Sequence, residues 1–197
     1  MEQNSLRIGR PPKAEPEALR SQLLGLIEHV GYERASMGSL AADVGMNVRT
    51  LHRYFPAKAD IVWGGIESSI EILVSELESA DDARSTLDAV ADAVAGVFDQ
   101  NADDRAIMRT RLRLIALTPE LQASRSATFE GWRHAIIRFV ASRLESAPDS
   151  LVCATAGTAL HAAIMEALNW WALHDEVADP AGCIAEALHG LSALGDR

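Results

Sequence analysis

Residues 29–62 read HVGYERASMGSLAADVGMNVRTLHRYFPAKADIV, and two short helices fit into this stretch almost end to end. Ser36 can cap a helix over residues 37–44 and Asn47 a second helix over residues 48–55, because both side chains accept hydrogen bonds from the free N–H groups of a helix start. Only a short turn separates the two segments. Helices joined so closely must cross at a steep angle, so the stretch predicts a helix-turn-helix.

Three positions in this stretch meet the steric demands of such a crossing. Ala41 is small where the helices approach, Gly45 accepts a positive φ in the turn, and Leu51 can close the gap between the helices. These residue types at these intervals are also common in helical proteins by chance. The flanking residues therefore decide the assignment.

The rest of the chain has the periodicity of helices, with apolar residues at intervals of three and four and few prolines. The first stripe predicts a helix that begins near Pro16 and ends at Gly31. It consists of Leu19, Leu23, Leu26, Ile27 and Val30. Further helices are predicted at 58–79, 83–100, 104–117, 119–145, 150–174 and 180–194. The sequence thus predicts an all-α protein of about nine helices, with a three-helix N-terminal head and a helical C-terminal body.

Charge is divided unevenly along the chain. The formal net charge is −10, yet residues 1–60 hold 8 Lys and Arg against 7 Asp and Glu, a balance of +1. Residues 61–197 hold 10 against 21, a balance of −11. Because affinity for phosphate comes from Lys and Arg, such a protein would touch nucleic acid through its N-terminal part.

Together these residues resemble the DNA-binding head of TetR-family transcriptional regulators. The resemblance covers about residues 17–62 and rests on a Gly-aromatic pair, a Ser cap, the crossing residues, the recognition helix and a following Lys. In this sequence they are Gly31-Tyr32, Ser36, Leu40-Ala41 with Gly45, Thr50-Leu51-His52-Arg53-Tyr54-Phe55, and Lys58 with Ile61. The segment RTLHRYFPAKADIVWG, residues 49–64, is also similar to an actinobacterial subset related to regulators of mycofactocin genes.

The resemblance implies a domain order and a function. Residues 1–14 would form a flexible basic arm, residues 15–57 a helix-turn-helix DNA-binding domain, and residues 58–197 a helical effector-binding and dimerisation domain. The implied function is that of a ligand-responsive, sequence-specific regulator that acts as a homodimer. It would be a repressor, released from a palindromic operator on double-stranded DNA by a small apolar effector such as a fatty acyl compound or an acyl-CoA.

The predicted recognition helix, residues 48–55, would enter the major groove with its N-terminus first. Arg49 is the best candidate for a base contact, since a guanidinium can donate to O6 and N7 of one guanine; a solvated arginine is the alternative. The predicted base-reading residues are Val48, Arg49, Thr50 and His52, and the predicted phosphate contacts are Ser36, Arg53, Tyr54 and Lys58. Arg7, Arg10 and Lys13 form an arm that could follow the minor groove, or an ordinary charged tail.

Three departures from the family pattern fall in or beside this helix. His52 replaces the usual Tyr, Ala57 stands where Ser or Asn often caps the next helix, and Val48-Arg49 fills the variable start of the recognition helix. The operator sequence therefore cannot be copied from a relative.

The C-terminal body offers candidate surfaces for an effector and for a second subunit. The predicted pocket residues are Phe98, Met108, Leu112, Ile115, Phe129, Trp132 and Ile136, although such stripes also form ordinary cores. Arg109, Arg111 and Arg113 could meet an anionic group at the pocket mouth, or form a solvated face. The predicted dimer residues on the last two helices are Gly157, Ala163, Ile184, Leu188 and Leu191, with an intramolecular core as the alternative.

Gly64-Gly65 falls within the predicted helix 58–79, where each glycine costs about 0.5 to 1 kcal/mol relative to alanine. Close packing is one explanation. The other is that a helix softened at this point transmits effector binding to the head.

Other protein classes find less support in the sequence. Cys153 and Cys183 form neither a disulfide framework nor a zinc knuckle, which favours a reduced cytoplasm. No Ser-His-Asp order or phosphate-binding glycine loop stands out, so no enzyme activity, metal or cofactor is expected. No uninterrupted apolar run approaches the ~20 residues that span a bilayer, so no membrane partner is expected. A helical interaction module or a small enzyme without specific DNA binding is the alternative.

Overall fold

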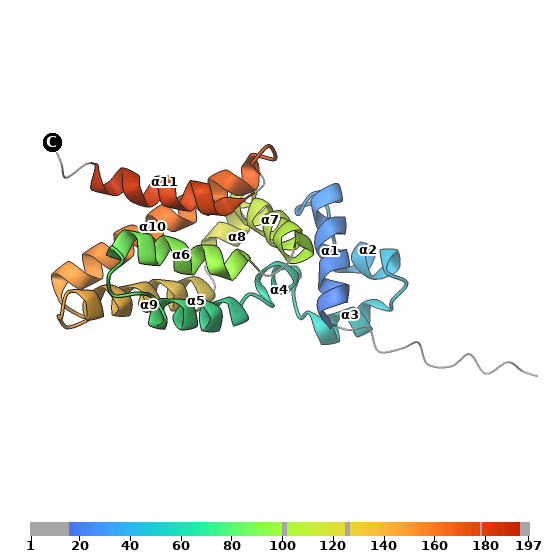
Figure 1. Cartoon of the computed structure of the whole chain (residues 1–197). Coiled ribbons are helices and arrows are strands. Elements are labelled where there is room, and N and C mark those ends of the chain that lie inside the picture. Colours follow the sequence, from blue (N-terminus) through green and yellow to red (C-terminus); the bar gives the residue numbers. More distant parts are fainter. Residues whose placement is uncertain (1–15, 100–101, 125–126, 178, 194–197) are drawn as a thin grey trace, which may run out of the picture.

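The computed structural model describes residues 16–99, 102–124, 127–177 and 179–193, and every regular element in these ranges is a helix. This confirms the predicted all-α class. Figure 1 shows α1 to α4 as a head at one end of an elongated body formed by α5 to α11. The helices are α1 (Pro16–Val30), α2 (Met37–Asp43), α3 (Val48–Tyr54), α4 (Lys58–Trp63), α5 (Ser68–Glu78), α6 (Thr86–Phe98), α7 (Ala102–Leu117), α8 (Pro119–Ala123), α9 (Ala127–Arg143), α10 (Leu151–Leu173) and α11 (Pro180–Ser192).

The two predicted caps of the helix-turn-helix are confirmed. The Ser36 hydroxyl accepts from the backbone N–H of Ser39 at 3.0 Å, and the Ser39 hydroxyl accepts in return from the N–H of Ser36 at 3.0 Å. The Asn47 side chain accepts from the N–H of Arg49 at 2.9 Å. Gly45, in the turn between α2 and α3, takes φ +66°, a conformation that glycine adopts without strain. The caps and the turn together fix the direction of α3.

The head has an apolar core that continues into the body. At the crossing of α2 and α3, Ala41 is buried and Leu51 has no exposed surface, as the sequence predicted. The same cluster extends to Leu114 and Ile115 of α7 and to Leu121 of α8. The head therefore rests on the body through packed side chains rather than through a free linker.

A second apolar cluster fills the body between α5, α6, α9, α10 and α11. Helix α10 is central, because it packs against α7, α9 and α11. On its buried side Ile164 and Trp171 are almost fully enclosed. This core holds the body helices together independently of the head.

Helix α10 is long and apolar enough to cross a membrane by length and composition alone, with a mean hydropathy of 1.5. No membrane-spanning segment was expected from the sequence, because no uninterrupted apolar run approaches the ~20 residues that span a bilayer. A single helix of this kind is weak evidence for a membrane, since core helices of soluble bundles have the same composition. Only 33% of its apolar stretch is buried, so α10 leaves an apolar face uncovered.

The predicted helix 58–79 is in fact divided, and the prediction of a softened continuous helix is wrong. Helix α4 ends at Trp63, Gly64 is extended, and Gly65 takes φ +79° before α5 begins at Ser68. A Cβ on Gly64 would clash with the guanidinium of Arg20, and one on Gly65 would lie 2.8 Å from a carboxylate oxygen of Glu17. The glycines thus allow a turn and a close approach of α1. The predicted helix 119–145 is likewise divided, into α8 and α9.

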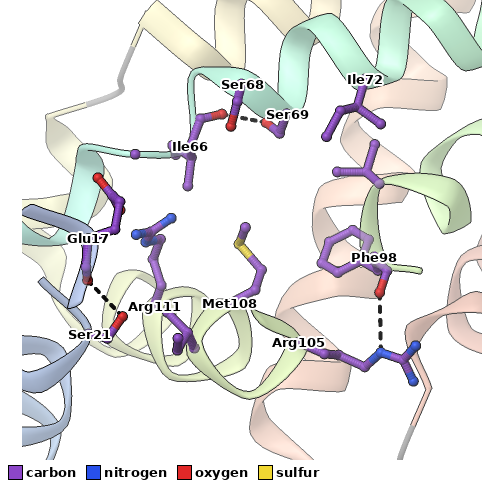
Figure 2. A pocket seen from close by; sticks show the side chains of 13 residues that line it. Glu17, Ser21, Ile66, Ser68, Ser69, Ile72, Phe98, Arg105, Met108 and Arg111 are labelled. Atoms are coloured by element: carbon purple, nitrogen blue, oxygen red, sulfur yellow. Dashed lines mark hydrogen bonds between the residues drawn. The ribbon is translucent and has the colours of Figure 1, made fainter. Parts of the chain in front are cut away.

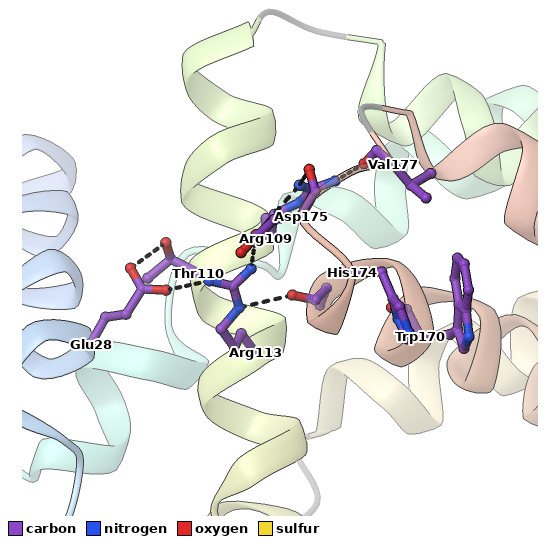
Figure 3. A network of polar contacts seen from close by, with 9 residues as sticks. Glu28, Arg109, Thr110, Arg113, Trp170, His174, Asp175 and Val177 are labelled. Carbon is purple, nitrogen blue, oxygen red and sulfur yellow. Dashed lines mark hydrogen bonds and ion pairs between the residues drawn. The ribbon is translucent and has the colours of Figure 1, made fainter.

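A polar network joins the head to the C-terminal end of α10 (Figure 3). The Glu28 carboxylate of α1 accepts from Thr110 Oγ1 at 2.9 Å and from a guanidinium nitrogen of Arg113 at 3.3 Å. Arg113 also donates to the carbonyl of Ala172 at 2.8 Å and pairs with Asp175. One side chain of α7 therefore connects α1 with the segment between α10 and α11.

Candidate DNA-binding interface and effector cavity

Helix α3 presents its N-terminal residues to solvent while its middle is anchored in the head. Leu51 is fully buried, and one turn earlier Val48 is 41% exposed and Arg49 is exposed. Within the described residues, no hydrogen bond or ion pair engages the Arg49 side chain. Thr50 is half-buried beside them. Three of the four predicted base-reading side chains thus lie together at the start of a capped helix.

His52, the fourth predicted base-reading residue, is exposed one turn further along α3. Its Nδ1 lies 3.0 Å from the carbonyl of Pro56. Because a carbonyl only accepts, this contact requires the proton on Nδ1, and in a neutral ring Nε2 is then left as an acceptor. In that state His52 can accept a hydrogen bond from a base amino group, which the tyrosine usual at this position could do only through its hydroxyl.

Two of the four predicted phosphate contacts, Arg53 and Tyr54, are accessible on α3, the first exposed and the second half-buried. Ser36 is exposed, but its hydroxyl is engaged in the cap of α2. The backbone N–H groups at that helix start are therefore better placed than the hydroxyl to meet a phosphate.

The surroundings of Lys58 differ from those expected of a phosphate contact. Its ammonium group donates to the carbonyl of Tyr32 and, at 3.0 Å, to that of Ala35, and it lies 3.9 Å from the centre of the Tyr32 ring. The carbonyls after α1 have no helical partner, so a cation satisfies them. Lys58 thus stabilises the connection between α1 and α2, and its ammonium group is engaged there rather than turned toward a phosphate.

Tyr32 links this connection to the body. Its hydroxyl lies 3.4 Å from a carboxylate oxygen of Glu120 on α8. Burial, with the negative charge of Glu120 as the second cause, raises the pKa of the Tyr32 hydroxyl to about 12. The side chain therefore stays neutral and can donate to Glu120 throughout the physiological range.

A cavity of about 270 Å³ lies where the head meets the body (Figure 2). Its walls come from α1, from the α4–α5 turn and from α5, α6 and α7. The lining is apolar on the body side, through residues such as Ile72, Phe98 and Met108, and polar on the head side, through Glu17 and Ser21.

A narrower apolar compartment of about 30 Å³ continues inward from this cavity. The two share Ile66, Ser69, Val97, Phe98, Met108 and Arg111 in their walls. Six of the seven predicted pocket residues line the compartment: Phe98, Met108, Leu112, Ile115, Phe129 and Trp132. Ile136 does not; it is fully buried in the body core, so this part of the prediction is wrong.

The residues on the other side of the cavity could not be predicted from the sequence. Ile66 and Ser69 follow the α4–α5 turn, which was predicted as continuous helix, and Glu17 and Ser21 belong to the head. Ser69 is buried, and its hydroxyl accepts from the indole N–H of Trp132 at 2.9 Å. No local pattern signals that these segments would meet.

The three arginines of α7 have different surroundings. Arg109 donates to the carbonyls of Asp175 and Val177 and stacks over Trp171, and Arg113 belongs to the network of Figure 3. Arg111 instead points into the cavity, where Figure 2 shows its guanidinium between Glu17 and Met108. Of these three arginines, Arg111 alone lines this cavity, and it lies inside the cavity rather than at its mouth as predicted.

A third cavity of about 760 Å³ lies between α8, α9 and α10. It shares Ile115, Phe129 and Met165 with the apolar compartment. Thr158, Ala162 and Glu166, on the exposed side of α10, form part of its wall. A face of α10 that could meet another subunit is thus close to the interior space.

The predicted dimer residues lie mostly inside the subunit. A Cβ on Gly157 would lie 2.5 Å from Ile137 of α9, and Ile184 and Leu188 have no exposed surface. These three were wrongly assigned to an interface, because the body core needs them. Ala163 and Leu191 are half-buried against the same core.

The exposed apolar side chains of α10 were not predicted from the sequence. Leu151 is 82% exposed, Val152 64%, and Trp170 and Leu173 45% each. The helix is apolar on nearly all sides, so its periodicity could not tell the inner face from the outer one. The exposed set marks the outer face.

Two family models match the chain. The model described as bacterial regulatory proteins, tetR family, covers residues 22–62, and the model described as MftR C-terminal domain covers residues 84–194, more than half of the chain. The first match contains the helix-turn-helix, and the second contains the whole of α6 to α11.

Individual proteins show the same similarity. A Mycobacterium tuberculosis H37Rv protein, named as a candidate mycofactocin biosynthesis transcriptional regulator MftR, is 28% identical over 193 residues, which cover 97% of this chain and 96% of that protein. The crystal structure of the TetR-family regulator PfmR from Thermus thermophilus has a TM-score of 0.54 at 21% identity and covers 91% of this chain and 98% of that one. A regulator from Rhodococcus sp. Rha1 has a TM-score of 0.56 at 17% identity, over 92% and 97%. At these identities the two solved structures show a shared fold.

Proposed function

Because the chain belongs to the TetR family of bacterial transcriptional regulators, we propose that it is a repressor that leaves a palindromic operator when a small apolar effector binds. The assignment made from the sequence, including the similarity to regulators of mycofactocin genes, is confirmed at the level of the family. Operator, effector and direction of regulation are parts of the proposal.

The observation that carries the proposal is the start of α3. An exposed arginine and an exposed valine stand at the capped end of a helix whose next turn is locked into the head core. A guanidinium can read one guanine, and an apolar side chain can meet a thymine methyl group. Arg49, Val48, Thr50 and His52 are therefore the proposed base contacts, with Arg53, Tyr54 and the start of α2 on phosphates.

The proposed division of labour follows the two apolar clusters. Residues 15–57 bind DNA, and residues 58–197 bind the effector and dimerise. The predicted basic arm, residues 1–14 with Arg7, Arg10 and Lys13, lies outside the described residues. Helix α4 lies between the two, because Ile61 and Val62 pack into the head core. The α4–α5 turn is then the joint at which the two parts meet.

A homodimer is proposed because a single α3 reads few base pairs. The exposed face of α10 supports this, since Leu151, Val152, Trp170 and Leu173 would otherwise remain in water. Exposed Ala159 and Ala162 lie between these ends of the helix and would allow a second helix to approach closely. The residues proposed for the interface are thus these six, in place of Gly157, Ile184 and Leu188.

The proposed effector site is the cavity between head and body together with its apolar compartment. A fatty acyl compound or an acyl-CoA is the proposed class of effector, and the protein acts by binding it rather than by a chemical reaction. The protein is proposed to be located in the cytoplasm, where the operator is. The alternative of an enzyme or a non-DNA-binding module has no specific observation in its favour.

Selection from random double-stranded DNA tests the proposal. The purified protein should enrich an inverted repeat whose half-sites are one helical turn or more apart, and the promoters of mycofactocin biosynthesis genes are the first natural DNA to compare with it. Enrichment of nothing above the input pool at physiological salt would contradict it.

A further inference from the structure

Arg111 is a cation enclosed in the protein without a protein partner. The residue is 4% exposed, and its Nε is buried without a hydrogen bond. Within the described residues no hydrogen bond or ion pair reaches any of its guanidinium nitrogens. Its closest counterparts along α7, Arg109 and Arg113, are both engaged with backbone carbonyls and acidic residues.

Such an arrangement is unfavourable in the empty protein. Burial lowers the pKa of the Arg111 guanidinium to about 10, and the nearby charge of Arg20 adds to this, whereas Glu17 and Glu67 act in the opposite direction. The group is still charged at neutral pH. A buried charge without a partner destabilises a fold, so an apolar residue of similar length would serve a purely structural purpose better.

We propose that Arg111 is the anion-binding residue of the effector site, and that the effector is an apolar molecule with one free carboxylate, which pairs with this guanidinium inside the cavity. This inference rests on the proposed function, since it names the chemical class of the effector. The guanidinium points into the cavity, and its planar donors match the two oxygens of a carboxylate.

The charge of the cavity favours one negative charge over several. Glu17 already lies at its head side, and the other cation in the wall, Arg105, is bound to the carbonyl of Phe98 and paired with Asp99. A carboxylate carries the single charge that Arg111 can neutralise. A phosphate group carries about −1.5 to −2 and would leave negative charge buried.

The shape of the apolar compartment suits the apolar part of the ligand. Beyond Arg111 the apolar compartment is lined by side chains such as Leu112, Phe129 and Trp132. An apolar chain attached to the carboxylate would bury itself there, displacing Met108 or Phe98 if it exceeds the small free volume. The CoA ester of the same acid has no charge at its acyl carbonyl, so it would leave Arg111 unpaired.

The position of Arg111 also explains how binding of this ligand would affect the head. Glu17, in the same cavity wall, pairs with Arg20 at 3.2 Å, and Arg20 donates to the carbonyl of Asp60 in α4 at 2.7 Å. A second carboxylate beside Glu17 repels it and weakens these contacts. Since these contacts hold α1 to α4, ligand binding changes the packing of these two helices beside the α4–α5 turn, where the head meets the body.

Calorimetric titration with a matched series of ligands tests the proposal. The probes are straight-chain carboxylates from hexanoate to hexadecanoate, each beside the alcohol and the CoA ester of the same chain. The wild-type dimer should bind the best carboxylate about tenfold or more tightly than its alcohol and its CoA ester. Arg111→Met, which keeps the length and removes the charge, should abolish this preference.

The matched control is Arg138→Met, which removes an exposed arginine of α9 that lines neither the cavity nor its compartment. It should leave the preference for the carboxylate unchanged. Arg111→Lys should retain part of it, since a point charge replaces the planar fork.

Thermal unfolding without ligand separates binding from a structural role. Arg111→Met should raise the unfolding temperature by about 2 to 4 °C or more, because it removes an unpaired buried charge. A lowered unfolding temperature together with an unchanged ligand preference would overturn the proposal. So would equal binding of every carboxylate and its alcohol, or tighter binding of the CoA ester.

The DNA selection distinguishes failure of this inference from failure of the proposed function. If the selection yields an operator while the carboxylate preference is missing, the carboxylate inference fails and the repressor proposal stands. A clear carboxylate preference without any selected operator would instead support Arg111 as the anion-binding residue and contradict the repressor proposal.

Discussion

Arg49 on α3 and Arg111 on α7 both lack a protein partner in the described part of the chain, but their surroundings are opposite. Arg49 is exposed at a helix start, where water and salt solvate its charge at little cost. Arg111 is 4% exposed, where an unpaired charge is expensive. An exposed free arginine is therefore common, and its role depends on its neighbours. A buried one that lines a cavity is the observation behind the proposed ligand contact.

The head, which carries Arg49, and the body, which carries Arg111, differ as well. In the head, capped helices and a closed apolar core hold α3 in one direction. The body contains neighbouring cavities that share wall residues. Rigidity suits the recognition of a fixed DNA surface, whereas internal space suits a ligand that changes the arrangement of helices.

The largest expected effect comes from Leu51→Ala beside its counterpart Leu112→Ala. Both side chains are buried, so each change should lower the free energy of unfolding by about 2 to 5 kcal/mol, with Leu112→Ala at the lower end because its site already borders a cavity. Only Leu51→Ala should also abolish operator binding, since α3 loses its anchor. Urea unfolding and fluorescence anisotropy at a temperature where both variants are folded measure the two effects.

The two leucines could also behave alike. Equal loss of DNA affinity in both variants would show that head and body do not divide their tasks in this way. Unchanged DNA affinity in Leu51→Ala would remove α3 from the DNA interface.

Arg49→Ala should have the next largest effect, on one base pair of the operator. The variant should lose about 1 to 3 kcal/mol of binding free energy to the selected sequence and lose its discrimination at that position, because the guanidinium no longer reads its guanine. Affinities for the selected operator and for duplexes changed at single positions measure this. Retained discrimination at every position would exclude Arg49 as a base contact.

Lys58→Ala tests whether Lys58 has a structural role or contacts a phosphate. Because Lys58 stabilises the α1–α2 connection, its loss should lower the free energy of unfolding by about 1 to 3 kcal/mol. The slope of log affinity against log salt should stay unchanged, whereas a lost phosphate contact would reduce it by about 0.9. A reduced slope would restore the original assignment of Lys58 to DNA.

The smallest expected effect is seen at alkaline pH with Tyr32→Phe. The hydroxyl ionises near 10 in the unfolded chain and at about 12 in the folded one, so the folded state holds more protons between these values. The wild type should lose stability as the pH rises through this window, and Tyr32→Phe should lose less. Chemical unfolding at about pH 9 and pH 11, on either side of the unfolded-state pKa, measures the difference. Parallel losses in both proteins would contradict the raised pKa.

Much of the head could be predicted from the sequence, because its determinants are local. The caps at Ser36 and Asn47, the turn at Gly45 and the buried Leu51 lie within a few residues of one another and constrain each other. Lys58 was misassigned because its partners, the carbonyls after α1, are distant in sequence and leave no pattern. The turn after α4 was predicted as helix because apolar periodicity continues across the break.

The body was predicted less well, because its helices are apolar on more than one face. The periodicity of α10 and α11 gives no preference between a core and an interface, so Ile184 and Leu188 were assigned to the wrong one. Six pocket residues were found because a cavity and a core use the same side chains. That Arg111 alone among three neighbouring arginines faces the cavity depends on the rotation of α7, which only the structure gives.

The most direct test of the central claim is the ratio of affinities for the selected operator and a scrambled duplex of the same length, measured by anisotropy at physiological salt. A regulator that reads bases through α3 should prefer the operator by about 10³-fold or more. Equal affinity for the two duplexes, with a steep salt dependence for both, would show that the protein binds only phosphates and would contradict the account.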